Sequence, residues 1–327
     1  MTPRILTFNE AGYDPFIDFL KAYSIVCVII AHILPPRFNS LLLFEVWGNM
    51  QVPMFVLIQV FHAYKKGVKP TLQWARIFKR VCLPFIAVQA VVIVFKALMG
   101  GGGGNFLIYG GYGPGSYYPW VYLQLAIILV LIYPCLKRLS IKQALLLFLA
   151  ISIGFELLFS FINLPDWLYR LLCVRYLFLI PLGMVWIEKG VVLNWSTIVL
   201  SVLSILAVLF FVFTSYNLEP LFFNTGWETH RWICYFYLPF LLTSGLYLIW
   251  RNVKKWTWIV SATKWTAARS YEIFLAQMAI FASFEVSVLS FIHNNIMRFA
   301  VWAIFSFVFS LLLGGQIYWF RKTILKW

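Results

Sequence analysis

The sequence predicts an all-α membrane protein, a polytopic bundle of about ten transmembrane helices with both termini in the cytoplasm. Three observations lead to this fold class. Of the 327 residues, 62% are hydrophobic and only 11% are charged, which is far from the composition of soluble domains. The apolar residues form runs close to the roughly 20 residues that span a bilayer. The charged residues lie in short clusters between these runs. We therefore treat residues 1–327 as a single membrane-embedded domain.

Each apolar run is a candidate span, and the connections between runs are short. The N-terminal segment carries acidic residues where a signal peptide would carry its apolar stretch, so the first run is expected to stay in the protein. The sixth and ninth runs are less uniform because they contain arginine or glutamate. The ten candidate spans cover residues 17–35, 46–64, 80–99, 119–136, 143–162, 167–187, 192–214, 231–250, 270–291 and 298–320.

Lysine and arginine are concentrated in alternate connections, which sets the orientation. The second-to-third, fourth-to-fifth and eighth-to-ninth connections and the C-terminal tail hold most of them, and the intervening connections hold few. Because cytoplasmic loops carry the excess of cations, these connections and both termini are expected in the cytoplasm. The net charge of +15 thus marks one side of a bilayer and does not indicate a nucleic-acid-binding surface. The five cysteines lie in apolar runs without ligand spacing, so no metal site is expected.

A glycine-rich stretch at about 100–118 interrupts the runs and cannot continue a helix. Its tyrosines, among them Tyr112, Tyr117 and Tyr118, suit a membrane interface. The charge pattern places this stretch outside the cytoplasm. A flexible lid and a plain linker with an aromatic belt both explain it.

The first run carries three candidate functional side chains, since ionisable groups inside a membrane helix are costly. Lys21 and His32 are eleven residues apart, so they share one helix face and lie about 16 Å apart along the axis. Asp18 precedes Lys21 by three residues and is placed to pair with it. An imidazole can take a proton from a hydroxyl as a general base. A histidine that only packs between helices explains the pattern equally well.

Two further groups of charges are candidates. Arg76, Lys79 and Arg80 lie where the third helix enters the membrane, and such a cluster either binds phosphates or only sets topology and contacts anionic lipid. Arg170 and Arg175 lie at the outer half of the sixth run, where topology requires no cation, and pair with Glu156, Asp166 or an anionic substrate. Glu272 in the ninth run is explained by ion pairing or by function.

The first helix resembles that of the acyltransferase-3 family of integral membrane O-acyltransferases, in which a cation and a histidine flank ten residues, as Lys21 and His32 do. Four further stretches are similar to family motifs. Two of these stretches depart from the family pattern. Gln59-Val60 stands where Ser-Gly is usual, and Gln277 stands where a histidine is frequent and can form hydrogen bonds but cannot act as a base. The four stretches are VPMFVLIQVF (52–61), RIFKRVCLPF (76–85), YYPWVYLQL (117–125) and RSYEIFLAQM (269–278).

The resemblance implies a polysaccharide O-acetyltransferase in the plasma (inner) membrane that moves an acetyl group from acetyl-coenzyme A to a hydroxyl of a cell-surface or lipid-linked glycan. It implies His32 as general base, with Lys21 and Asp18 as further catalytic-site residues, Asp18 orienting or pairing with Lys21. Direct transfer and an acyl-enzyme relay both fit. Donor phosphates would be held at the cytoplasmic face. Membrane lipids are expected partners and nucleic acids are not. The donor would be bound by Arg76, Lys79 and Arg80, and the acceptor by Arg170, Arg175, Glu272 and Gln277.

The alternative function is that of a multi-helix transporter or lipid-linked glycan flippase, in which His32 relays protons. A third possible function is that of a noncatalytic subunit of an envelope-assembly complex.

Overall fold

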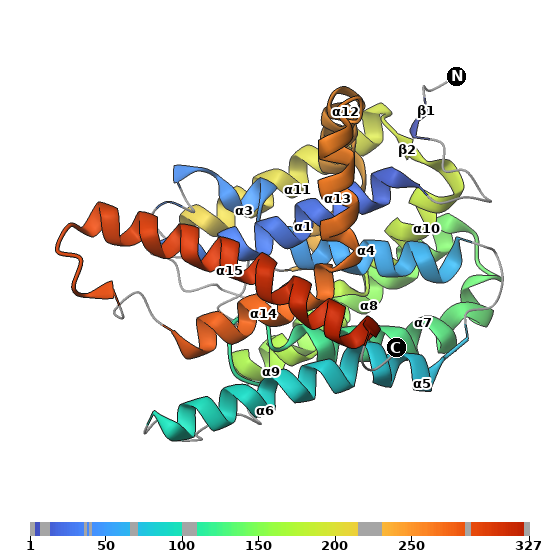
Figure 1. Ribbon diagram of the computed structural model, residues 1–327. Helices are drawn as coiled ribbons and strands as arrows, with labels where there is room; N and C mark the ends of the chain where they lie inside the picture. The colour runs from blue at the N-terminus through green and yellow to red at the C-terminus, as the bar shows by residue number, and fades with distance from the viewer. Residues whose placement is uncertain are drawn as a thin grey trace.

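The computed structural model describes residues 4–6, 14–35, 38, 41–65, 71–99, 110–214, 231–284 and 289–323. These residues form a predominantly helical protein, as the sequence predicts (Figure 1). The exception is a short antiparallel pair of strands, in which β1 (Arg4–Leu6) lies against β2 (Val191–Val192).

Seven helices of the described part are long and apolar enough to cross a membrane, judged by length and composition. Each coincides with one of the ten predicted runs. Two of the seven are composite, since they begin with irregular turns before the regular helix. The seven are α1 (Pro15–Ile33); Trp74–Leu98, which joins α5 (Trp74–Ile77), a π turn (Phe78–Cys82) and α6 (Leu83–Leu98); α7 (Tyr118–Leu136); α8 (Ile141–Phe161); Trp195–Val212 within α11 (Trp195–Thr214); Trp232–Val253, which joins a 3-10 turn (Trp232–Tyr235), a π turn (Leu238–Leu242) and α12 (Thr243–Val253); and α15 (Asn295–Thr323).

The other three predicted runs correspond to shorter helices. The second contains α4 (Gln51–Tyr64), and the ninth contains α14 (Ser270–Ser283). The sixth run, predicted as one span, is divided into α9 (Asp166–Leu171), a 3-10 turn (Val174–Tyr176) and α10 (Leu179–Lys189). Pro181 explains this division, because proline is tolerated in the first turn of α10 but would break the interior of one long helix. The total of ten spans and the cytoplasmic placement of both termini remain predictions.

One helix was not predicted from the sequence. The eighth-to-ninth connection, predicted as a link, contains α13 (Thr257–Ala268), which packs against α1. Its 12 residues are too short for a membrane span, so a search for apolar runs of about 20 passes over it.

The centre of the bundle is formed by α1, α4, α10 and α14. α1 and α4 lie side by side and run in opposite directions, and α10 packs on α4 (Figure 1). α14 is buried from Glu272 to Met278 and contacts α1, α6 and α15. In the most apolar stretch of α1 half of the residues are buried, compared with 17% in that of α15. α1 therefore lies inside the bundle and α15 at its surface. A short α3 (Phe44–Trp47) precedes α4 and packs on α11.

Candidate functional site

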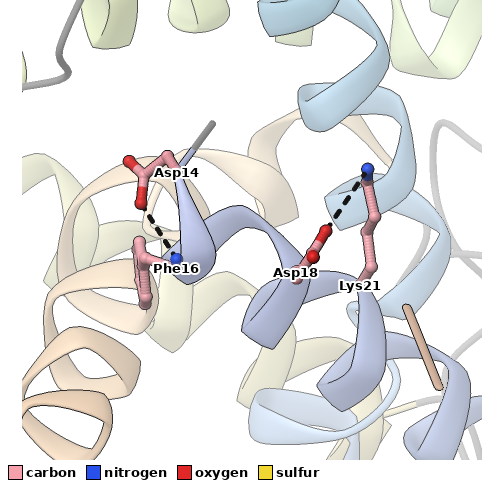
Figure 2. Close-up of polar contacts among 4 residues, drawn as sticks. All are labelled: Asp14, Phe16, Asp18 and Lys21. Atoms are coloured by element: carbon pink, nitrogen blue, oxygen red, sulfur yellow. Dashed lines mark hydrogen bonds and ion pairs between the residues drawn. The ribbon is translucent and has the colours of Figure 1, made fainter. Parts of the chain in front are cut away.

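The first turn of α1 fixes the position of Lys21. Pro15 is the first helical residue, and Asp14 caps the helix by accepting a hydrogen bond of 2.9 Å from the backbone N–H of Phe16 (Figure 2). One turn later the Lys21 ammonium lies 3.9 Å from a carboxylate oxygen of Asp18, the pair that their spacing predicts (Figure 2). The ion pair restrains the lysine side chain on the inner face of α1.

Lys21 and His32 line one cavity of about 890 Å³. This volume lies within the range of small-molecule and cofactor sites. Five of the ten residues predicted as site residues line it: Lys21, His32, Arg80, Arg170 and Glu272. The other lining residues come from α1, the turn before α4, α4, the π turn before α6, α7, α9, α13, α14, α15 and the segment 111–117, so the cavity lies at the centre of the bundle.

We call the part of the cavity wall formed by Lys21, Arg80, Glu272 and Arg321 the basic end, because three of these four side chains are cationic. His62 at the end of α4 also lines the cavity and interacts electrostatically with Lys21. Arg80 belongs to the π turn, in which the N–H of Leu83 bonds to the carbonyl of Phe78. Pro84 accounts for the turn, because it has no N–H to donate to the carbonyl four residues earlier. Arg76, one turn before Arg80, lies outside the set of lining residues, as does Lys79.

Glu272 and Arg321 form a buried ion pair at the basic end. An Nη2 atom of Arg321 lies 2.5 Å from Oε1 of Glu272, and their side chains are 10% and 3% exposed. Tyr271 donates a hydrogen bond of 2.7 Å to the carbonyl of Val81, which ties α14 to the π turn. From the sequence, ion pairing was one explanation of Glu272, whereas Arg321 counted only as a cation of the C-terminal tail and was not predicted as its partner.

His32 lies in the last turn of α1, at the end of the cavity that we call the histidine end: His32, Asn49, Gln51 and residues 111–118. Its ring is 5.9 Å from that of Phe281, so one side of the imidazole contacts an aromatic wall. Asn49 lies in the turn before α4 and Gln51 is the first residue of α4, which is antiparallel to α1 (Figure 1). The histidine therefore shares its end of the cavity with two amide side chains.

Residues 110–117, which we call the glycine loop, form one wall of the cavity. The glycines at 110, 111, 113 and 115 all have positive φ, a conformation that favours glycine. A Cβ atom on Gly113 would lie 2.3 Å from the carbonyl oxygen of Met278, and one on Gly115 would lie 2.8 Å from the Phe274 ring. Glycine thus allows this backbone to pack directly on α14. Residues 100–109 of the predicted loop lie outside the described residues.

Hydrogen bonds from three side chains hold the glycine loop in place, and two of these side chains, Gln89 and Gln277, are buried. Gln89 in α6 is 2% exposed, accepts a 2.7 Å hydrogen bond from the N–H of Tyr112 and donates one of 3.0 Å to its carbonyl. Gln277 in α14 donates to the carbonyl of Pro114 at 3.3 Å, and Trp120 donates to that of Gly110 at 2.7 Å. Gln277, predicted as an acceptor-binding residue, thus contacts the loop backbone. A lone glutamine in an apolar run was the signal that could have identified Gln89.

The arginines of the sixth run have different surroundings. Arg170 lines the cavity, whereas Arg175 is 3% exposed and lies 4.8–5.6 Å from the ring centres of Tyr117, Tyr169 and Tyr176. Arg175 also donates to the carbonyl of Arg170 at 3.3 Å. The structure therefore places Arg175 behind Arg170 and Tyr117, two lining residues, with its charge against aromatic faces. Glu156, one predicted partner, instead pairs with Arg231 at 3.6 Å, and the side chain of Asp166 lies outside the described part.

A family model described as an acyltransferase domain, that of acyltransferase-3, matches residues 14–315. All ten predicted site residues fall inside this range: Asp18, Lys21, His32, Arg76, Lys79, Arg80, Arg170, Arg175, Glu272 and Gln277. Searches among curated proteins and among solved structures gave no significant match.

Proposed function

Because the chain belongs to the acyltransferase-3 family, we propose that this membrane acyltransferase transfers an acetyl group from acetyl-coenzyme A to a hydroxyl of a cell-surface or lipid-linked glycan. The observation that supports this proposal is the single cavity that contains both the basic end and His32. Along α1 the two ends are separated by about 16 Å, from Lys21 to His32. An anionic donor bound at one end can thus present an acyl group at the other.

The basic end suits the nucleotide part of the donor. Arg80 lines the cavity and, with Lys21, supplies charge-assisted hydrogen bonds to phosphate oxygens. Arg76 and Lys79 lie on the same helical entry and add positive potential outside the cavity. The donor's pantetheine arm would extend along α1, past Val28, which also lines the cavity, toward His32.

At the histidine end His32 acts as general base in this proposal. It removes the proton of the acceptor hydroxyl as the oxygen forms a bond to the thioester carbonyl carbon. The carbon–sulfur bond then breaks, and the same proton passes from His32 to the departing coenzyme A thiolate. Arg170 would bind the acceptor, and the glycine loop would form the wall against which the acceptor lies. The plasma (inner) membrane is the expected site of action, since the acceptors are envelope glycans.

Release of free thiol from acetyl-coenzyme A tests the proposal. The purified protein in detergent is incubated with envelope glycan, and wild type is compared with His32→Ala and with the control His293→Ala, an exposed histidine outside the cavity. Loss of thiol release and of glycan acetylation only in His32→Ala is expected. If wild type moves the glycan across proteoliposomes without changing it covalently, the transporter alternative replaces this proposal.

A further inference from the structure

Arg321, near the end of α15, is held at the basic end by contacts that leave part of its guanidinium without a partner. It is 9% exposed, pairs with Glu272 at 2.5 Å and lies 5.5 Å from the ring centre of Tyr318. Its Nε atom is buried and makes no hydrogen bond within the described part of the chain. Arg321 is also one of the residues that line the cavity, so its guanidinium borders the space in which a ligand would lie.

The charges around Arg321 indicate that the ligand is an anion. Lys21, Arg80 and Arg321 all line the cavity, and Glu272 is the single acidic residue among the lining residues that the structure describes. Glu272 is already engaged by Arg321, which leaves the end with a positive excess. A guanidinium fixed in orientation by a carboxylate is well suited to phosphate, whose oxygens accept its parallel N–H groups.

We propose that Arg321 is a phosphate-binding residue of the donor site and that Glu272 is the positioning residue that orients it. This inference rests on the proposed function, because the phosphates are those of acetyl-coenzyme A. The family match ends at residue 315, so it does not extend to Arg321. Phosphate binding at the basic end therefore comes from two sides, with Arg80 before α6 and Arg321 at the end of α15.

Binding of ligands with and without phosphate tests this role. Affinities of the full-length protein in detergent are measured for acetyl-coenzyme A, for acetyl-pantetheine, which lacks every phosphate, and for adenosine 3′,5′-bisphosphate. The variants are Arg321→Gln, Arg321→Lys and Glu272→Gln, and the matched control is Lys322→Gln, which removes an exposed cation from the next position of α15. Thermal unfolding of each variant is recorded beside the affinities.

Arg321→Gln is expected to weaken binding of acetyl-coenzyme A and of the bisphosphate about tenfold or more, the effect of losing a charge-assisted hydrogen bond, and to leave acetyl-pantetheine unaffected. Arg321→Lys and Glu272→Gln should give smaller losses with the same ligand pattern, and Lys322→Gln none. Equal weakening of all three ligands, or none, overturns the inference while acyl transfer stands. If wild type binds the bisphosphate through Arg321 but never consumes acetyl-coenzyme A, the phosphate site stands and the proposed function fails. Binding of neither phosphate ligand by wild type refutes both.

Discussion

Gly113→Ala tests whether the glycine loop is held against α14 as the structure has it. Gly113 has a φ of +89°, and an added Cβ would lie 2.3 Å from the carbonyl oxygen of Met278 and 2.8 Å from its Cγ. The left-handed backbone costs a residue with a Cβ about 1–2 kcal/mol. Overpacking adds about 1–3 kcal/mol. If the loop stays in place, the free energy of unfolding should therefore fall by about 2–5 kcal/mol.

The alternative response to the same substitution is movement of the loop away from α14, which would show in catalysis. A displacement of about 1 Å at a reacting centre can lower a rate about a hundredfold. We therefore expect Gly113→Ala to lower the melting temperature, the rate of acyl transfer, or both. Thermal unfolding in detergent and the rate of thiol release from acetyl-coenzyme A measure the two effects.

The matched control for this substitution is Gly154→Ala in α8. No atom lies within 4 Å of a Cβ built at Gly154, which is in a regular helix. Alanine is favoured there over glycine by about 0.5–1 kcal/mol, so the control should be unchanged or slightly more stable. The reasoning is refuted if Gly113→Ala matches Gly154→Ala in both melting temperature and transfer rate.

Three further predictions concern other contacts of the site. Gln89→Leu leaves both backbone groups of Tyr112 without their hydrogen-bond partners and should lower kcat more than tenfold. The free energy of unfolding should fall by only about 1–3 kcal/mol, because buried hydrogen bonds in membranes are individually weak. An unchanged kcat in a folded variant would contradict this prediction. Arg80→Ala should raise KM for acetyl-coenzyme A about tenfold. Arg76→Ala should raise KM less, because Arg76 does not line the cavity. Equal effects of the two substitutions would show that the cavity lining does not define the donor site. Arg231→Met removes the ion-pair partner of Glu156, whose side chain is 12% exposed, and should destabilise the protein by about 3–5 kcal/mol. An unaltered melting temperature would show that this pair does not stabilise the fold.

The first helix shows how much of the site the sequence could predict. That Lys21 and His32 line one cavity follows from helical periodicity, because eleven residues return to nearly the same face of the helix. The pairing of Asp18 with Lys21 follows from the same rule. Such predictions succeed where the side chains belong to one regular helix, since the geometry is then local.

Arg321 and Gln89 show what the sequence could not predict. Arg321 belongs to a basic C-terminal cluster that the charge pattern explains by topology alone, and only packing of α15 against α14 brings it to Glu272. Gln89 is one polar residue in an apolar run, and its partner Tyr112 lies beyond a long glycine-rich stretch. Contacts between distant segments depend on how the helices pack, and neither periodicity nor charge counting contains that information.

The irregular backbone segments of this chain line the cavity. The π turn supplies Arg80 and Val81, the divided sixth run supplies Trp167 and Arg170, and the glycine loop supplies a continuous wall. Backbone that departs from helix at membrane depth is tolerated only where it is buried in protein or borders a polar cavity, because its N–H and C=O groups need partners other than lipid. Gln89, Gln277 and Trp120 provide such partners for the glycine loop. The irregular backbone segments therefore indicate the position of the cavity independently of the charged side chains. Both kinds of observation indicate the same space, between Arg80 and His32.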